Sequence, residues 1–263
     1  MLIINADDWG GWCEATDAAA ACFRAGRITS ATAMVFMDDS PRGAELAKDL
    51  GIEIGLHLNL TQEFTAARVP ADVQTDHAKV CRFLRSSRYA VMLYHPALQK
   101  AFRRVCAAQF SEFERLYGRA PAHVDGHHHK HLSMNALVGG MIPRTCSVRR
   151  NFSFQTGEKN FLNRTYRAIV DGWLRRRHPV ADYFVSLGNC LQADSLGRVA
   201  HRAQSANVEL MTHPAMREEF EFLMSRKGEE FVRQVRLGRH AELRRSESGK
   251  MLGAASAPAM AKS

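Results

Sequence analysis

The sequence lacks the cysteine patterns of disulfide-stabilised domains and of zinc ribbons. Its 263 residues include six cysteines, and no two of them form a C-x-x-C pair. This usage is typical of reduced thiols, so we expect a cytoplasmic protein. Only 8 prolines and 18 glycines are present, which excludes collagen-like and low-complexity polymers.

Long apolar runs are also absent. No stretch of about 18 uncharged apolar residues occurs, so we expect no transmembrane helix. The first residues, MLIINADDWGGW, have no basic segment and soon reach two aspartates. This is unlike a secretory signal peptide, which begins with basic residues and continues with an uninterrupted apolar run.

The charge balance is basic but has no nucleic-acid motif with it. Lys and Arg total 36 against 27 for Asp and Glu, a formal charge of +9. The basic residues are scattered, as in Arg103-Arg104 and Arg175-Arg176-Arg177. We therefore expect no nucleic-acid partner, and a solvated basic surface or one that attracts acidic glycans.

Apolar, β-branched runs alternate with helical patterns along most of the chain. We predict strands over residues 2–5, 28–37, 52–58, 122–125, 145–149, 182–187 and 207–212. We predict helices over residues 14–25, 41–50, 96–117, 133–141, 161–177, 195–205 and 227–237. Residues 61–94 show no clear periodicity and are interpreted as a long loop with a little helix.

This alternation predicts an α/β fold with a mostly parallel sheet and right-handed crossovers. At this length a (β/α) barrel competes with an open doubly wound sheet. No G-x-G-x-x-G follows the first strand, which disfavours a dinucleotide-binding fold. We expect one domain over residues 1–245. Residues 246–263, small, polar and aperiodic, are expected to form a disordered tail.

Carboxylates and imidazoles follow four of the predicted strands. They are Asp7 and Asp8, His57, Asp125 with His127, His128, His129 and His131, and His213. The carboxyl ends of parallel strands meet on one side of a barrel or sheet. The sequence therefore predicts that these groups gather in one site.

This set of side chains suits a catalytic metal. A carboxylate and two imidazoles make a three-ligand site with open positions. Cysteine is absent from these segments, so Zn²⁺, Mg²⁺, Mn²⁺ and Co²⁺ all fit. Each segment taken alone has another interpretation: Asp7-Asp8 as a turn, His57 as a core histidine, and the pair Arg149-Arg150 as surface charge or a clamp for substrate oxygens.

Four motifs together resemble the YdjC-like carbohydrate deacetylases. They are NADDWG at 5–10, GLHLNLT at 55–61, PAHVDGHHHKHL at 121–132 and VELMTHPAM at 208–216. The resemblance covers residues 1 to about 245. It implies a distorted (β/α) barrel with its active site at the carboxyl ends of the strands. It also implies an enzyme that removes the acetyl group from an N-acetylated sugar, an oligosaccharide or a glycoconjugate.

The resemblance also implies roles for individual residues, carried over motif by motif. The expected ligands of one divalent ion, Mg²⁺ or Zn²⁺ with Mn²⁺ or Co²⁺ as alternatives, are Asp8, His57 and His127. The expected general base is Asp7 and the expected general acid is His213. Asp125 would fix a histidine tautomer. The expected substrate contacts are Arg149, His129 and Trp9. At the position of Trp9 the family usually has Phe.

Two other functions stay open at this point. A metal-dependent phosphoesterase is mildly favoured by the positive charge, but no second carboxylate-rich motif supplies a two-metal clamp. A catalytically inactive sugar-binding module would bind sugar without releasing amine. The sequence does not fix the oligomeric state, for which a homodimer is the common default.

Overall fold

A computed structural model describes residues 1–153 and 161–243 of the chain. The tail predicted over 246–263 lies outside these ranges. Within them, no helix combines the length and the apolar character needed to span a lipid bilayer.

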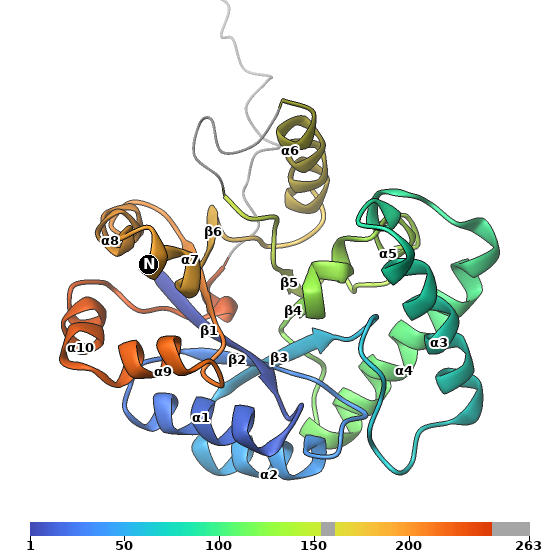
Figure 1. The fold of residues 1–263 in the computed structure, drawn as a ribbon, viewed down its shortest axis with the longest axis horizontal. Helices are drawn as coiled ribbons and strands as arrows, with labels where there is room; N and C mark the ends of the chain where they lie inside the picture. Colours follow the sequence, from blue (N-terminus) through green and yellow to red (C-terminus); the bar gives the residue numbers. More distant parts are fainter. Residues whose placement is uncertain (154–160, 244–263) are drawn as a thin grey trace, which may run out of the picture.

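Seven parallel strands form the centre of the molecule, in the order β5-β4-β3-β2-β1-β7-β6 (Figure 1). They are β1 (Leu2–Trp9), β2 (Ser30–Ala33), β3 (Glu53–Leu58), β4 (His123–Gly126), β5 (Ser147–Val148), β6 (Tyr183–Ser186) and β7 (Val208–Thr212). The sheet curls into an incomplete barrel flanked by helices, which confirms the predicted distorted (β/α) barrel.

The edge strands β5 and β6 are not adjacent in the sheet. Two backbone hydrogen bonds nevertheless connect these edges. The N–H of Val148 donates to the carbonyl of Pro179 at 3.0 Å, and the N–H of Ser153 donates to the carbonyl of Phe184 at 2.8 Å.

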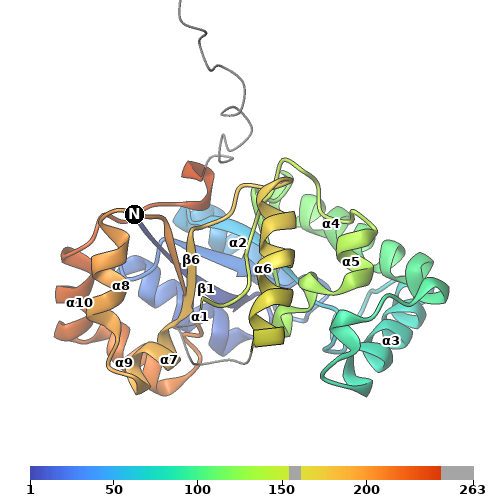
Figure 2. The ribbon, with the colours of Figure 1, turned by 90° about the horizontal axis from the view of Figure 1, so that it is seen from above.

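The longer helices surround the sheet, as the two views in Figures 1 and 2 show. They are α1 (Cys13–Arg24), α2 (Ser40–Leu50), α3 (Ala71–Ser86), α4 (Gln99–Tyr117), α6 (Phe161–Arg175), α8 (Leu196–Ala203), α9 (Arg217–Met224) and α10 (Arg226–Arg233). Short helical turns complete the described chain: α5 (Met134–Val138), α7 (Leu187–Gln192), η1 (Ala90–Met92), η2 (Pro96–Leu98), η3 (His127–Leu132) and η4 (His240–Glu242).

Helix α4 forms where its apolar spacing predicts it. Ala101, Phe102, Val105 and Phe113 are buried along one face, as an amphipathic helix on a sheet requires. The helix ends at Gly118, whose φ of +68° lies in the left-handed region that glycine adopts most readily.

The interpretation of residues 61–94 as mostly loop was wrong, because α3 occupies Ala71–Ser86. Its buried face does follow helical spacing, through Val73, Asp76, His77 and Val80. Two of these four side chains are polar, so the apolar pattern is interrupted. Asp76 pairs with Arg104 of α4 at 2.8 Å, a contact that the sequence alone did not indicate.

The two faces of the sheet differ in polarity. Side chains alternate between faces along a strand. One face packs against the helices and is apolar, as Ile4, Leu56 and Leu210 illustrate. The opposite face carries buried polar side chains, among them Asn5, Ser30, Thr32, Glu53, His57, His123, Asp125 and Glu209. The interior of the incomplete barrel is therefore polar, and each charge in it needs a partner.

Candidate active site

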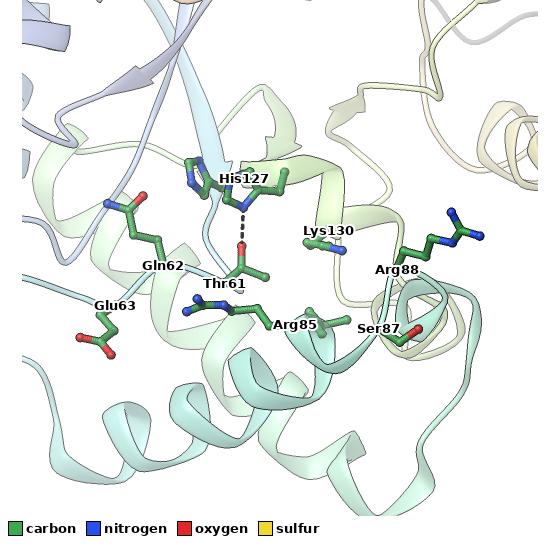
Figure 3. A pocket seen from close by; sticks show the side chains of 10 residues that line it. Thr61, Gln62, Glu63, Arg85, Ser87, Arg88, His127 and Lys130 are labelled. Carbon is green, nitrogen blue, oxygen red and sulfur yellow. Dashed lines mark hydrogen bonds between the residues drawn. The ribbon is translucent and has the colours of Figure 1, made fainter. Parts of the chain in front are cut away.

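A cavity of about 680 Å³ opens beside the carboxyl end of β3 (Figure 3). It is lined by Thr61, Gln62, Glu63, Leu84, Arg85, Ser87, Arg88, His127, His128 and Lys130. Three of these side chains are cationic and one is anionic. The cavity thus combines the predicted ligand His127 with a positively charged wall, and it is large enough for a sugar unit.

Asp8 and His57 lie beside His127, which is one of the residues that line this cavity. The Oδ1 atom of Asp8 is 3.2 Å from Nε2 of His57 and 3.1 Å from Nδ1 of His127. All three candidate ligand atoms lie within 4.8 Å of one another. Ligand atoms about 2.0–2.2 Å from one shared ion lie about 3–4 Å apart. The donor set and its spacing fit one divalent metal ion.

The backbone turns sharply to present Asp8. Its φ is +66°, and the pairing of β1 with β2 shifts register between Ala6 and Trp9. Aspartate is one of the few residues that tolerate the left-handed region. Burial acts to raise the pKa of Asp8, but hydrogen bonds from His127 and His57 outweigh it and hold the pKa well below its ordinary value.

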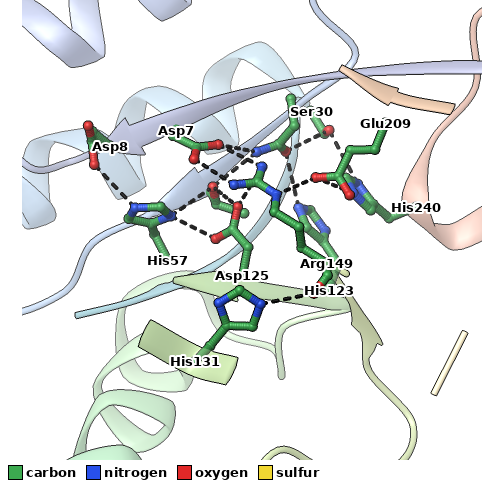
Figure 4. A network of polar contacts seen from close by, with 12 residues as sticks. Asp7, Asp8, Ser30, His57, His123, Asp125, His131, Arg149, Glu209 and His240 are labelled. Atoms are coloured by element: carbon green, nitrogen blue, oxygen red, sulfur yellow. Dashed lines mark hydrogen bonds and ion pairs between the residues drawn. The ribbon is translucent and has the colours of Figure 1, made fainter. Parts of the chain in front are cut away.

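Asp125 orients the ring of His57 (Figure 4). Its Oδ1 atom lies 2.7 Å from Nδ1 of His57, and Thr32 donates a hydrogen bond of 3.0 Å to its Oδ2 atom. With Nδ1–H of His57 donated to Asp125, a metal ion in place of the proton on Nε2 would be bound by Nε2 and by Asp8 beside it. This carboxylate–histidine contact is the arrangement that commonly fixes the tautomer of a metal-binding histidine.

Asp7 lies beside this group and is clamped by Arg149. The guanidinium donates to both carboxylate oxygens, at 2.6 Å to Oδ2 and 2.7 Å to Oδ1. Asn5 donates a further hydrogen bond of 3.0 Å to Oδ1. Burial acts to raise the pKa of Asp7, but the charge of Arg149 outweighs it and holds the pKa well below its ordinary value. Asp7 is therefore ionised at neutral pH.

Arg149 is itself buried and surrounded by carboxylates. Besides Asp7, it contacts Asp125 at 2.7 Å and Glu209 at 2.6 Å. Only 2% of the residue is exposed. The structure thus gives Arg149 three carboxylate partners within the protein, and its burial leaves almost no surface exposed to a substrate.

His213 directly follows β7 and also lies near Asp8. Its Nε2 atom lies 4.0 Å from Oδ2 of Asp8, and 30% of its side chain is exposed. Glu219 fixes the local backbone by accepting hydrogen bonds of 2.8 Å from the His213 N–H and from the Thr212 hydroxyl. The imidazole is thus placed near the candidate metal ligands and remains open to solvent.

The other histidines of the cluster point in different directions. His128 is exposed and contacts the Thr61 hydroxyl at 3.1 Å, while His131 is buried with Nε2 2.9 Å from the Arg149 carbonyl. His129 packs edge-on against Phe152. Burial lowers the pKa of His129 to about 3 and that of His131 to about 4, so both are neutral.

The structure places Trp9 away from the cavity. Its side chain is fully buried in the apolar core and donates a hydrogen bond of 2.9 Å to the Gly43 carbonyl. A ring that is 0% exposed has no face available for a sugar. Trp9 is therefore a core residue in this structure and leaves the set of candidate substrate contacts.

Sequence reasoning missed the polar residues that support the site from inside the barrel. They are Asn5, Thr32, Glu209 and His240. A signal for three of them was present, because Asn5, Thr32 and Glu209 each stand between two apolar residues in or directly beside a predicted strand. Successive side chains of a strand point to opposite faces, so a polar residue between apolar ones indicates a second face of different polarity.

Comparison with known proteins identifies the family of this chain. Residues 1–251 match the profile of the family described as YdjC-like protein. The chain belongs to the YdjC-like family. This confirms the resemblance inferred from the four sequence motifs.

Two curated relatives and one crystal structure illustrate the similarity. A chitooligosaccharide deacetylase of Enterobacter sp. (strain 638) is 27% identical over 226 residues, which are 82% of this chain and 81% of that protein. One from Yersinia enterocolitica is 32% identical over 223 residues with the same coverage. A crystal structure from Enterococcus faecalis V583, named for cellobiose-phosphate cleavage, has a TM-score of 0.64 at 20% identity over 91% of this chain and 97% of that one. At that identity the last similarity concerns the fold.

Proposed function

We propose that this YdjC-like protein is a metal-dependent deacetylase. It hydrolyses the N-acetyl group of an N-acetylated sugar, in an oligosaccharide or a glycoconjugate, to a free amine and acetate. The observation that carries the proposal is the grouping of Asp8, His57 and His127 within 4.8 Å, with Asp7 and His213 beside them. The activity named for the curated relatives supports the same reaction.

One divalent ion would be held by Asp8, Nε2 of His57 and Nδ1 of His127. When bound, such an ion polarises the acetyl carbonyl and lowers the pKa of a water molecule. The oxygen and nitrogen donors suit Mg²⁺ or Zn²⁺, and also Mn²⁺ or Co²⁺. We expect one ion per chain.

Asp7 is placed to accept a proton from the attacking water. A carboxylate offers about four lone-pair sites, and Arg149 and Asn5 occupy three of them in this structure. No hydrogen bond from residues 1–153 or 161–243 occupies the remaining site, on Oδ2, and this site would accept the proton. Arg149 also fixes the direction of the carboxylate, which positions the base before substrate arrives.

His213 is placed to protonate the leaving amine. Its imidazole lies near Asp8 but is partly exposed, so it can contact a bound substrate. Protonation is required because an unprotonated amine leaves poorly when the C–N bond breaks. Asp7 and His213 reach the candidate metal site from different strands, β1 and β7, as a base and an acid acting in sequence require.

The sugar would occupy the cavity beside His127. Arg85 and Lys130 line this cavity, and His128 and Thr61 add polar groups to its lining (Figure 3). Cationic and hydroxyl groups donate hydrogen bonds to sugar oxygens and to any acidic group on the glycan. His129 is packed against Phe152, and it remains a candidate contact at the inner edge of the site.

The decisive experiment measures acetate release from N-acetylglucosamine, diacetylchitobiose and N-acetyl sugar conjugates, with chelator and after metals are added back. The Asp7→Asn variant should keep its metal and lose about 10²- to 10⁴-fold in kcat, because a positioned base contributes that much. Wild-type turnover in Asp7→Asn would remove the base assignment. Cleavage of a chromogenic phosphate ester without acetate release would favour the phosphoesterase instead.

A further inference from the structure

A second cluster of titratable side chains lies inside the barrel, at the opposite ends of the strands. His240 is 3% exposed, and its backbone N–H donates a hydrogen bond of 2.9 Å to Glu53, the first residue of β3. Its ring nitrogens lie 3.6 Å from a Glu53 oxygen and 3.7 Å from a Glu209 oxygen. His240 belongs to η4, near the end of the described chain, and not to any strand of the sheet.

The segment that carries His240 is fastened to the sheet on both sides. Before it, Leu2 donates a hydrogen bond of 2.8 Å to the Arg236 carbonyl, and Gly238 donates one of 2.9 Å to the Leu2 carbonyl. After it, Leu243 packs against Ile3 of β1. The position of the imidazole is therefore determined by the fold.

The geometry argues against a second metal site here, although Glu53, His123 and His240 have donor atoms within 4.8 Å of one another. The two imidazole rings are stacked, with centroids 3.7 Å apart and planes only 7° from parallel. Lone pairs of ring nitrogens lie in the ring planes, so two stacked rings cannot direct them at one ion. A charged imidazolium stacked on a neutral imidazole fits this arrangement.

Both carboxylates of the cluster have cationic partners without a metal, because each faces His240 and Glu209 also contacts Arg149. Two carboxylates, Glu53 and Glu209, face His240 from β3 and β7, and His123 faces it from β4. Burial acts to lower the pKa of His240, but the two carboxylates outweigh it and raise the pKa to about 9. Burial places the pKa of His123 well below its ordinary value, so this ring is neutral.

Direct hydrogen bonds connect the cluster to Asp7, the proposed catalytic base. Glu209 accepts a hydrogen bond of 2.6 Å from Nε of Arg149, and the other end of the same guanidinium clamps Asp7 at 2.6 and 2.7 Å. Figure 4 shows Arg149 between Glu209 on one side and Asp7 on the other. The direction of the Asp7 carboxylate thus depends on the position of the Arg149 guanidinium. Glu209 fixes that position through its contact with Nε of Arg149.

We propose that His240 is a positioning residue for the deacetylase site. It acts through Glu209 and Arg149 on Asp7, and it never touches substrate. Its positive charge holds the Glu209 carboxylate in the orientation that contacts Arg149. It also offsets the electrostatic repulsion between Glu53 and Glu209. The segment after α10 is therefore part of the machinery that aligns the base. This inference rests on the proposed function for its effect on turnover, but not for the chain of contacts.

The first test compares the kinetics of His240→Gln and His240→Lys. We expect His240→Gln to lower kcat about 10-fold with unchanged KM and metal content, because substrate and metal contacts are untouched. His240→Lys retains the positive charge and should recover most of that loss. In the wild type kcat should fall as the pH rises through about 9, and in His240→Lys this fall should move to higher pH.

The matched control is His77→Gln. His77 is also 3% exposed, but it stacks on Phe64 and has no ion pair in the described part of the chain. This variant should lose stability and keep the wild-type kcat and pH profile. If His240→Gln behaves in the same way, with lower stability and full kcat, the positioning role is overturned.

A double-mutant cycle tests the contacts without using activity. The free energies of unfolding of His240→Gln, Asp7→Asn and the double variant should be non-additive, because both residues belong to one ion-pair network. Additive effects would overturn the proposed connection. If the wild type releases no acetate from any substrate, the proposed function fails, and the cycle still decides whether His240 and Asp7 are coupled.

Discussion

Asp8 combines local backbone strain with a position in the candidate metal site. Its left-handed φ of +66° costs on the order of 1–3 kcal/mol, and such residues concentrate at functional sites. The neighbouring histidines at 3.1 and 3.2 Å hold the side chain in place. The strain therefore points to a role for this carboxylate that folding alone does not require.

A prediction at this scale concerns metal binding by Asp8. Asp8→Asn retains the size of the side chain and its tolerance of positive φ, but it removes the negative charge. We expect metal affinity to fall more than 10-fold, because hard divalent ions prefer carboxylate to amide oxygens. Elemental analysis after dialysis measures the effect. The exposed residue Asp38 provides the control, since Asp38→Asn should retain one ion per chain.

A second residue-scale prediction concerns the charged wall of the cavity. Arg85 and Lys130 form no ion pair with any residue in 1–153 or 161–243, and both line the cavity beside His127. The double variant Arg85→Ala/Lys130→Ala should raise KM about 10-fold or more, since each charged hydrogen bond contributes about 1.5–3 kcal/mol. The kcat should change little. An unchanged KM for every sugar tested would place the substrate elsewhere.

At the scale of elements, strand β3 depends on a glycine inside the barrel. A Cβ atom on Gly55 would lie 2.4 Å from ring atoms of His123 and 2.5 Å from the His123 carbonyl oxygen. No side chain other than hydrogen fits between β3 and β4 at this point. His57 lies two residues further along β3 and on the same face. The position of His57 therefore depends on the close approach of β3 to β4 at Gly55.

Gly55→Ala should therefore disturb both stability and the site. We expect a loss of about 1–3 kcal/mol, as for overpacking of a dense core, together with weaker metal binding through displacement of His57. Denaturant unfolding and metal titration measure the two effects. Gly172→Ala in α6 is the control, because a Cβ there meets nothing within 4 Å. That change should be neutral or stabilise the protein by about 0.5–1 kcal/mol.

At the scale of the whole molecule, the pH dependence of stability should reveal the clamped imidazolium of His240. Its pKa is raised from 6.5 to about 9 in the folded chain. A raised folded pKa contributes stability that is fully present below the unfolded pKa and is lost as the pH rises through the folded one. A shift of this size corresponds to about 3 kcal/mol.

The prediction is a difference between the wild type and His240→Gln. The gap between their free energies of unfolding should be largest below about pH 6.5 and should shrink as the pH passes about 9. Comparison of the two proteins at each pH cancels the titration of tyrosines, cysteines and lysines. Denaturant titrations at a series of pH values measure the gap, and a gap that is constant over this range would contradict the assignment of charge to His240.

The sequence by itself determined the features that depend on local spacing. Alternating strand and helix patterns specified an α/β fold with a mostly parallel sheet, the family motifs indicated the barrel, and apolar spacing specified α4. Asp7, Asp8, His57 and His213 end or follow strands, so parallel pairing alone brings them to one end of the barrel. For these residues, position along a strand is enough to predict position in space.

Only the tertiary structure decided which side chains face each other across the barrel. The side chain of Trp9 lies in the apolar core. Arg149 contacts three carboxylates, and His240 lies beside Glu209. The tertiary structure also formed α3, whose buried face includes Asp76, the partner of Arg104 in α4. The physical reason is common to these cases. A buried charge is stable only beside its partner, and that partner lies on another element, at a distance along the chain that local spacing does not encode.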